Sequence, residues 1–387
     1  MIALIAGAHF LSHFYLMALP PLLPMMRAEL GLSYAALGAA VSLLAAVTAL
    51  GQTPIGVLVD RTGAAPWLVA GNALMIAGAL GIAASPGLGA LLVAAAIAGL
   101  GNATIHPCDY AILSGSIRQE RMGRAFSLHT AAGYAGFAAA PPAMIALEAL
   151  VGWRGALASA ALAGLPCVAA LAAFARVLRS EATPRTPPPP AHRLLASRPI
   201  LLLFLFMTLL AMGASGAQTF MVAALPTLQG VSIAVAASAL TAWLLSSTVG
   251  TLAGGVVADR TGRLVLIVAA MLLTAATLTA ALGLVPLGAP GTIAVAAAAG
   301  FALGAVMPSR DLLVREAAPP GTAGQVFGFV SSGLPLGQAL APAPMGLLMD
   351  LGAPGAVFVA CGLLLTAAVL TAQGSRAARR PLAAPAE

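Results

Sequence analysis

The length and composition of this chain are typical of an integral membrane protein. Of its 387 residues, 60% are hydrophobic and only 7% are charged, whereas soluble domains are roughly 45–50% apolar and about 25% charged. The formal net charge of +7 comes from arginines that stand singly or in small groups without interleaved aromatic residues, which argues against a nucleic-acid partner.

Cysteine and nucleotide motifs give no sign of a cofactor. The three cysteines all lie in apolar stretches without CxxC spacing, so the sequence indicates neither a disulfide framework nor a zinc site. These residues are Cys108, Cys167 and Cys361. No GxxxxGK[ST] loop occurs, which argues against nucleotide-driven chemistry. We therefore predict no cofactor and no bound metal.

Twelve apolar segments follow one another along the chain, each near the roughly 20 residues that a membrane-spanning helix needs. The first six lie near 2–24, 35–58, 65–85, 88–114, 124–147 and 153–175. The other six lie near 199–225, 234–257, 264–286, 290–313, 323–348 and 352–374. Residues 2–24 are expected to stay as the first span, because they lack the basic start of a cleaved signal peptide.

This order predicts an all-α membrane protein of two six-helix bundles. The first bundle covers 1–176 and the second 199–375, with a cytoplasmic linker at 177–198 and a cytoplasmic tail at 376–387. Fifteen of the eighteen arginines fall on the side of the linker and tail, against only Arg27 and Arg154 on the other side and Arg310 within a span. The positive-inside rule then predicts a bacterial inner-membrane protein with both termini in the cytoplasm.

The two halves of the sequence repeat each other. Gly56–Gly63 (GVLVDRTG) recurs 199 residues later as Gly255–Gly262 (GVVADRTG). The pair His106-Pro107 aligns with Met307-Pro308 at an offset of 201, and Gly136 and Pro141 align at the same offset with Gly337 and Pro342. Parallel repeats of this kind predict a solute site where the halves face each other.

The DRTG segment, which lies between spans two and three and again between spans eight and nine, resembles the signature loop of the major facilitator superfamily. The resemblance covers essentially the whole chain and implies that family's fold and its alternating-access transport. It also implies a gating role for five loop residues: Asp60, Arg61, Asp259, Arg260 and Arg263. The first loop departs from the pattern, because Ala64, Ala65 and Pro66 stand where basic residues are usual.

Within that superfamily, the stretch Gly101–Pro107 (GNATIHP) followed by an acidic residue is similar to the fosmidomycin-resistance type of exporter. This second resemblance covers little more than the fourth and fifth spans. The glycines and prolines of the fifth span resemble the antiporter motif only loosely, since its Gly-Pro pair is missing.

Ionisable residues inside the spans are the candidates for the mechanism, because such groups are costly in lipid unless they face an interior pathway. Asn102, His106 and Asp109 are spaced i, i+4, i+7 and share one stripe of the fourth span. His9 and His13 are one turn apart in the first span. Imidazoles titrate near pH 6.5, so these groups suit proton exchange. A buried structural hydrogen bond is the competing interpretation of each.

Further candidates lie in other spans. Arg310 and Asp311 stand in the tenth span, where Arg310 suits a bidentate contact with an anion, a pairing with Asp109, or an escape of its side chain to the cytoplasmic surface. His129 is spaced with Gly133 and Gly136, and Gln52 is a polar residue of the second span. Packing roles compete for both.

The leading hypothesis is a secondary active transporter, expected to be a monomer among membrane lipids, that exports a small, anionic organic solute or drug in exchange for protons. Proton-coupled uptake of a small carboxylate is the alternative. A membrane-embedded metal enzyme at His106 and Asp109 is a remote one, because the HxxD pair is unspecific and no third ligand stands at metal spacing. A transporter-like sensor shares most of these features but is expected to carry a soluble extension.

Overall fold

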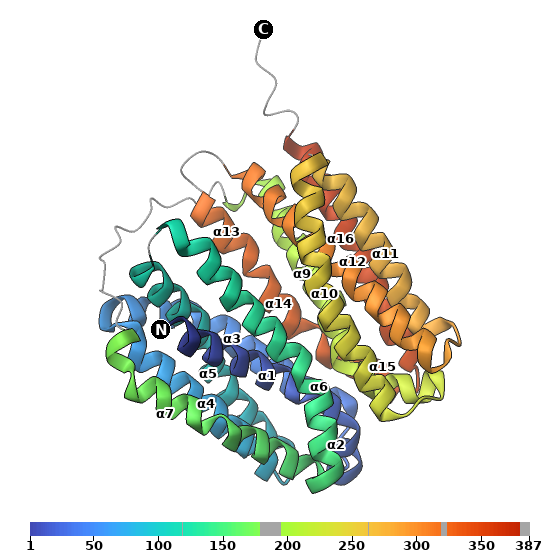
Figure 1. The fold of residues 1–387 in the computed structure, drawn as a ribbon. Helices are drawn as coiled ribbons and strands as arrows, with labels where there is room; N and C mark the ends of the chain where they lie inside the picture. The colour runs from blue at the N-terminus through green and yellow to red at the C-terminus, as the bar shows by residue number, and fades with distance from the viewer. Residues whose placement is uncertain (118, 179–194, 262, 319–322, 380–387) are drawn as a thin grey trace. The chain divides into compact units, whose positions relative to one another are not determined.

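The computed structural model describes residues 1–117, 119–178, 195–261, 263–318 and 323–379. Most of the predicted linker and the end of the predicted tail, together with Arg118 and Gly262, therefore lie outside the described residues. In the described ranges the regular structure is helical throughout (Figure 1). The first half holds α1 (Ile2–Ala18), η1 (Pro20–Leu22), α2 (Leu23–Leu30), α3 (Tyr34–Thr62), α4 (Ala64–Ala84), α5 (Leu88–Ser116), α6 (Gln119–Ala163), α7 (Leu165–Ala173) and η2 (Ala175–Leu178).

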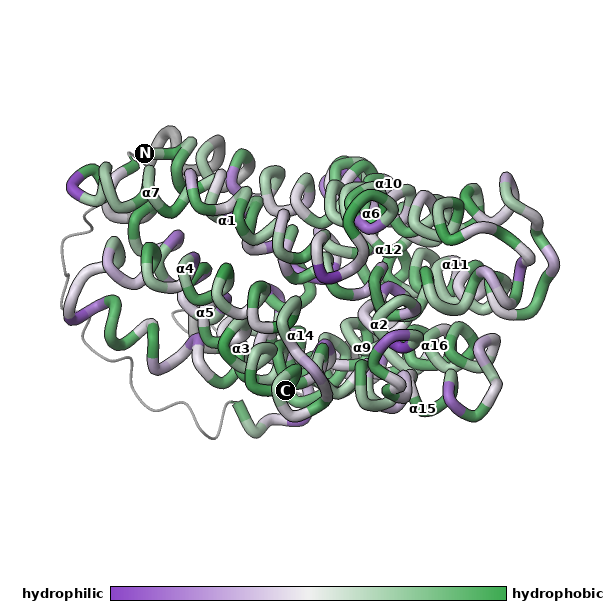
Figure 2. The backbone as a smooth tube through the Cα atoms, turned by 90° about the horizontal axis from the view of Figure 1, so that it is seen from below, coloured by the Kyte–Doolittle hydropathy of each residue, from purple (hydrophilic) through white to green (hydrophobic). Residues whose placement is uncertain are grey.

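The second half holds α9 (Arg198–Gln229), α10 (Ile233–Thr261), α11 (Leu264–Leu284), α12 (Gly288–Ala317), α13 (Ala323–Ser331), α14 (Gly333–Leu340), α15 (Pro342–Asp350) and α16 (Pro354–Arg379). Figure 2 shows the hydrophobic colour running along most of the length of these helices. Ten stretches of the described chain are long and apolar enough to cross a membrane. The predicted all-α, multi-span fold is confirmed.

The difference between ten long stretches and twelve predicted spans has two local causes. The predicted fifth and sixth spans fall within one apolar stretch, Leu128–Ala173, which bends at Gly152 where φ is +70°. The predicted eleventh span is divided into three short helices, α13, α14 and α15. Its glycines and prolines explain the division, since each lowers the stability of a continuous helix.

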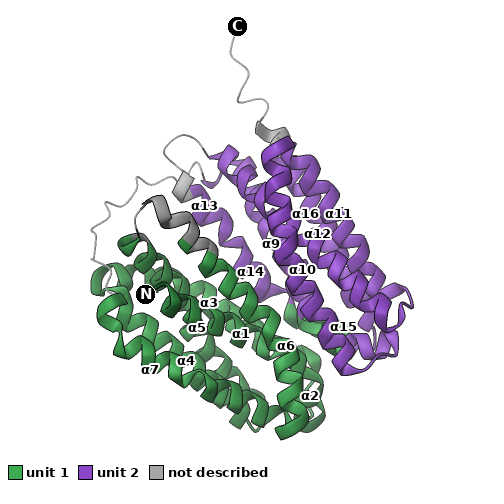
Figure 3. Ribbon diagram, viewed as in Figure 1, with its two compact units in different colours: residues 1–185, 219–223, 342–350 green, residues 186–218, 224–341, 351–387 purple. Residues whose placement is uncertain are grey.

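The chain forms two compact units (Figure 3). Unit 1 comprises residues 1–185 with two short segments from the second half, 219–223 and 342–350. Unit 2 comprises 186–218, 224–341 and 351–387. The predicted bundle boundaries at residues 176 and 199 stay predictions.

Unit 1 is held together by close contacts between helices that carry small residues. Helix α5 packs on α3 and α4, and α6 packs on α1. A Cβ atom on Gly99 would stand 2.5 Å from the Leu44 carbonyl oxygen, and one on Gly78 would stand 2.6 Å from Ala98 Cβ. Small residues let these helix backbones approach each other closely. Close packing is needed because an apolar side chain is as well accommodated by lipid as by a neighbouring helix.

Unit 2 repeats part of this packing. Helix α12 packs on α10 and α11, and α11 packs on α16. In unit 1 a Cβ on Gly56 would stand 4.0 Å from Pro107, and in unit 2 a Cβ on Gly255 would stand 3.8 Å from Pro308. The repeated sequence pairs therefore meet in the same way within each unit.

Candidate functional site

Helix α1 places two histidines on one face of unit 1. His9 is buried and His13 is half-buried. Because i and i+4 side chains lie on the same side of a helix, both rings point to the same neighbours. The Ser12 hydroxyl donates to the His9 carbonyl at 2.8 Å, and His13 Nδ1 lies 3.1 Å from that same oxygen. The carbonyl can only accept, so His13 Nδ1 carries the proton of the ring.

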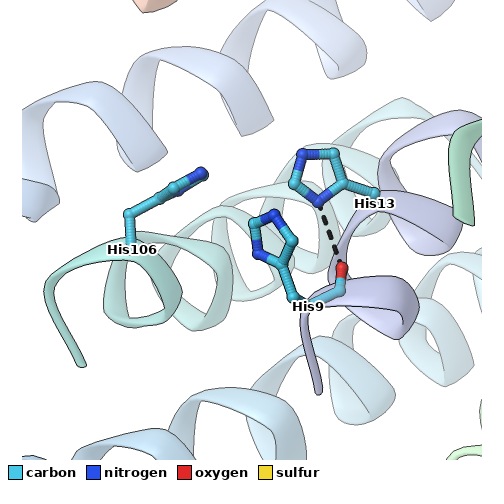
Figure 4. Close-up of side chains that lie close together, drawn as sticks. All are labelled: His9, His13 and His106. Atoms are coloured by element: carbon cyan, nitrogen blue, oxygen red, sulfur yellow. Dashed lines mark hydrogen bonds between the residues drawn. The ribbon is translucent and has the colours of Figure 1, made fainter. Parts of the chain in front are cut away.

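Helix α5 brings His106 and Asp109 to the same place. The Asp109 side chain is completely buried and His106 is half-buried. Pro107 stands between them inside the helix, where its missing N–H removes one helical hydrogen bond. Figure 4 shows His106 on one helix facing His9 and His13 on another.

Helix α6 completes the group with His129. His129 Nε2 lies 2.9 Å from Asp109 Oδ2, and both side chains are buried. One turn later, Gly133 leaves room for α1, because a Cβ there would stand 2.6 Å from His9 Nε2. The sequence had spaced His129 with Gly133 and Gly136 on one face, and the structure places that face against the α1 histidines.

Four imidazoles and one carboxylate therefore meet inside unit 1, and we call this group the histidine cluster: His9, His13, His106, His129 and Asp109. The ring centroids of His9 and His129 are 3.6 Å apart and stacked, and those of His9 and His13 are 4.2 Å apart. The His106 centroid lies 5.3 Å from that of His9 and 5.9 Å from that of His13. The sequence predicted two pairs on separate spans, and the structure brings both pairs and His129 together.

The polar atoms of the histidine cluster are incompletely paired. His9 Nδ1 lies 3.3 Å from Asp109 Oδ2, yet it makes no hydrogen bond to any described residue, so this contact is electrostatic only. Asp109 Oδ1 and His106 Nδ1 also lack hydrogen-bond partners among the described residues. Buried polar atoms without partners are uncommon and costly. Spare lone pairs of this kind suit the binding of a cation.

Two sets of three side chains in the cluster have ligand atoms close enough to share one ion. These sets are His9, His13 and His106, and His9, Asp109 and His129, each with its ligand atoms within 4.8 Å of one another. Two aromatic side chains border the rings. The Phe137 ring centroid is 4.3 Å from that of His13, and the Tyr110 centroid is 5.9 Å from those of His106 and His129.

Two other predicted site residues of the first half lie near α3 rather than in the cluster. Asn102 is buried, and its Nδ2 atom donates to Thr48 Oγ1 at 3.3 Å. Thr48 in turn donates to the Gly99 carbonyl at 3.1 Å, which ties α3 to α5. Gln52 is half-buried one turn further along α3. These contacts tie Asn102 to α3, and its role in a substrate or proton pathway stays a prediction.

Unit 2 carries a different charged pair at the repeated position. Arg310 Nε donates to Asp311 Oδ1 at 3.0 Å. The Arg310 side chain is 13% exposed and the Asp311 side chain is 51% exposed. Arg310 thus contacts its own neighbour in α12, and its predicted pairing with Asp109 stays a prediction.

The predicted gating residues lie at helix ends and are exposed: Asp60, Arg61, Asp259, Arg260 and Arg263. In unit 1, the Trp67 indole donates to Thr62 Oγ1 at 2.7 Å beside the first loop. In unit 2, Asp259 lines an open pocket of about 450 Å³ together with Arg315 and Glu316 from the end of α12.

Sequence reasoning missed two polar contacts at the other end of unit 1. Glu29 accepts from the Trp153 indole at 2.6 Å and from Arg154 Nε at 2.7 Å. Asp350 accepts from Arg27 at 2.5 Å and from the backbone amides of Tyr34 and Ala35 at 2.8 Å each. The sequence did contain a signal for these contacts. Arg27 and Arg154 are the two arginines predicted on that side, and an acidic partner could have been sought for each.

Comparisons with known proteins agree with this architecture. The family model described as Major Facilitator Superfamily matches residues 5–231 and 204–386. A bacterial homolog of the human lysosomal transporter Spinster, in an inward-facing and occupied conformation, has a TM-score of 0.79 at 16% identity over 98% of this chain and 96% of that one. The nucleoside transporter NupG, as a D323A mutant, has a TM-score of 0.77 at 16% identity over 97% and 99% of the two chains.

The same Spinster homolog in its unoccupied conformation has a TM-score of 0.75 at 16% identity. At this identity the structural likeness shows the fold alone. A search of curated proteins finds no match. The family model spans both halves of the sequence, and its two matched ranges repeat the two halves that the DRTG loops mark. The chain therefore belongs to the major facilitator superfamily.

Proposed function

We propose that this protein exports a small, anionic organic solute in exchange for protons, with the histidine cluster as the proton-binding group. Family membership makes the chain a multi-pass membrane transporter of small solutes rather than an enzyme. We add four proposals to this assignment: proton coupling, export as the direction of transport, an anionic substrate and a location in the inner membrane.

The observation that carries the proposal is the carboxylate of Asp109, which is completely buried in a membrane-spanning helix. A carboxylate at this depth is costly unless it is paired or neutralised. Taking up a proton removes that cost, and releasing it restores the charge that His129 and His9 face at 2.9 and 3.3 Å. A transporter can use this difference to favour one state of its cycle over another.

Arg310 supports the anionic class of solute. Its guanidinium is mostly buried in α12 and contacts only one carboxylate oxygen in the described structure, Asp311 Oδ1 at 3.0 Å. A guanidinium offers five N–H donors in a planar fork, so several remain for the paired oxygens of a carboxylate or phosphonate. The Asp311 side chain is half exposed and can give way to such a ligand.

The test compares the wild-type protein with Asp109→Asn. Each is produced in a fosmidomycin-sensitive strain lacking its own exporters, and growth is measured with fosmidomycin and with a panel of anionic and neutral antibiotics. We expect wild type to raise resistance to anionic compounds and Asp109→Asn to lose that effect. Asparagine keeps the shape of the side chain but cannot exchange a proton, so expression should persist.

Reconstitution then separates the direction of transport from the coupling. Proteoliposomes are loaded with a compound from the resistant set, and a pH gradient of either sign is imposed. Loss of compound against an inward proton flow supports export, whereas accumulation along that flow favours the uptake of a carboxylate. The Asp109→Asn protein should retain solute exchange without a gradient. An unchanged pH dependence in this variant would remove Asp109 from the coupling.

A further inference from the structure

We propose that the histidine cluster is also a binding site for one divalent first-row transition-metal ion, held by the neutral imidazoles of His9, His13 and His106. The inference goes beyond the proposed function, because it depends on the geometry of unit 1 and not on any step of a transport cycle. It also revises the expectation, drawn from sequence spacing alone, that no third ligand accompanies the histidines.

The first support is the convergence of the ligand atoms. The three imidazoles come from two helices that pack in the same unit, and their ligand atoms lie within 4.8 Å of one another. Two nitrogen ligands of a tetrahedral zinc ion are about 3.3 Å apart. The ligand nitrogens would each have to move by roughly 1 Å to reach the spacing of a tetrahedral site. Small rotations of the side chains achieve a shift of this size.

The second support is the tautomer of His13. Its Nδ1 atom must donate to the His9 carbonyl at 3.1 Å, as the dashed line in Figure 4 marks. The lone pair of the ring is then on Nε2. Metal-binding histidines almost always donate their other ring nitrogen to a carbonyl or carboxylate in this way, which fixes the ring and raises its basicity. Ser12 strengthens the arrangement, because its hydroxyl donates to the same carbonyl.

The third support is the set of polar atoms that the packing leaves unused. His106 Nδ1 is buried yet makes no hydrogen bond within the described residues. His9 Nδ1 makes none either, although it lies 3.3 Å from Asp109 Oδ2. A cluster that served only to stabilise the helices would pair such atoms, since a buried polar group without a partner destabilises the fold. A metal ion would use the lone pairs that the protein does not.

The chemistry of the donors selects the class of ion. Imidazole nitrogen suits Zn²⁺, Co²⁺, Ni²⁺, Cu²⁺ and Fe²⁺, whereas Mg²⁺ and Ca²⁺ prefer several oxygen ligands. Asp109 is the only carboxylate in the cluster, so a hard cation would find too few oxygens. His13 and His106 are half-buried, whereas the side chain of His9 is buried.

Binding is tested directly on purified protein. The full chain is isolated in detergent through an affinity tag without histidine, treated with a chelator, and titrated with Co²⁺ and Zn²⁺ at fixed pH. We expect one equivalent of Co²⁺ with the visible absorption of a tetrahedral site, and displacement of that absorption by Zn²⁺. His13→Ala and His106→Ala should each weaken the affinity by about tenfold or more, given the 10–100-fold cost of altering even outer-shell partners of a metal.

Two further variants keep the test decisive. His192→Ala removes the remaining histidine of the sequence, which lies outside the described residues, and should leave the affinity unchanged. His106→Cys replaces one nitrogen ligand with a thiolate, so Co²⁺ should then show a thiolate charge-transfer band that the wild type lacks. This gain of signal reports on the site even if the alanine variants fold poorly.

Absence of stoichiometric binding by the wild type would overturn the inference, and so would equal affinity in wild type, His13→Ala and His106→Ala. The titration needs no transport, so its failure would leave the proposed export function standing. Protons and metal ions compete for the same lone pairs, and transport assays are therefore run with a chelator. Loss of transport with retained metal binding would count against the export function alone.

Discussion

Gly133 is the residue that allows α6 to approach the imidazole of His9. A Cβ atom there would stand 2.6 Å from His9 Nε2 and 3.1 Å from His13 Cε1. We therefore expect Gly133→Ala to displace the His9 ring and to destabilise the protein by about 1–3 kcal/mol, the usual cost of overpacking. The measurement is thermal unfolding in detergent, together with the solute exchange of proteoliposomes.

Gly89 provides the matched control, because it also lies in a helix of unit 1 but a Cβ there would have no atom within 4 Å. Gly89→Ala should leave exchange unchanged and stabilise α5 by up to about 1 kcal/mol through helix propensity. If Gly133→Ala behaved like Gly89→Ala, the close contact between α6 and His9 would have no functional weight.

The spacing of the ionisable residues predicted only what lies on one helix. His9 and His13 on α1, and His106 and Asp109 on α5, follow from the i, i+3 and i, i+4 positions of an α-helix. That α1, α5 and α6 meet at these residues could not be predicted, because helices that are apolar on every side do not reveal which face meets which neighbour. The combination of His129 with Gly133 was the one local hint.

Helix α15 contributes the acid that caps α3. Gly31 ends α2 with φ at +64°, and the Ser33 hydroxyl accepts from the Ala36 amide at 3.1 Å. Asp350, at the end of α15, accepts the two preceding amides of the same helix turn. A carboxylate at this position satisfies free N–H groups and faces the positive end of the helix dipole.

The protonation of Asp350 follows from these contacts. Burial alone would raise the pKa of its carboxyl, but hydrogen bonds from the Ala35 and Tyr34 amides and from Arg27 outweigh that effect and hold the pKa below its ordinary value. A lowered pKa in the folded state means that the stabilisation is complete above the unfolded value of about 3.9. It is lost as the pH falls through the lower folded pKa.

Asp350→Asn should therefore lower the stability of the protein by about 1 kcal/mol at neutral pH, the size of a helix cap near the surface. The difference in melting temperature from wild type should be equal at pH 7 and pH 5 and smaller at pH 3. Ser232→Ala is the matched control, because Ser232 has the equivalent hydroxyl position before α10 and accepts from the Val235 amide at 3.3 Å without a charge. Its effect should not depend on pH.

A difference in melting temperature between wild type and Asp350→Asn that grew toward low pH would contradict this account of the α3 cap.

The sequence predicted neither the cap nor the division of the eleventh span into α13, α14 and α15. Its glycines and prolines indicated weak helical continuity, but the position of each break depends on packing, as the contact of Gly346 with the Tyr34 carbonyl in unit 1 illustrates.

The two halves of the chain share a helix contact but differ in the charged residues that they carry. Gly56 with Pro107 and Gly255 with Pro308 make the same helix contact in each unit. Yet Asp109 in unit 1 corresponds to Arg310 in unit 2 at the offset of 201. The first half thus carries four imidazoles and a carboxylate in one cluster, and the second carries a permanently charged guanidinium. This difference between the halves supports the proposed exchange of protons for an anionic solute.

The distribution of arginines leads to a prediction about the orientation of the entire chain. Fifteen arginines lie on the predicted cytoplasmic side and two, Arg27 and Arg154, on the other. Both of these two are paired with acids, Asp350 and Glu29, in the structure, so the opposite side presents little free positive charge. The positive-inside rule depends on arginine in short loops near the span ends, and the loops of this chain are short.

Reporter fusions in a bacterial host measure this orientation. Alkaline phosphatase joined after Gly31 should be active, because that point is predicted to lie on the side opposite the cytoplasm, and green fluorescent protein joined after Gly31 should be dark. The same reporters joined after Arg379 should give the opposite result, since the tail is expected in the cytoplasm. A fusion after Thr62 serves as an internal control and should behave like the tail. Active phosphatase after both Thr62 and Arg379 would invert the topology and place the DRTG loops on the wrong side for a cytoplasmic gate.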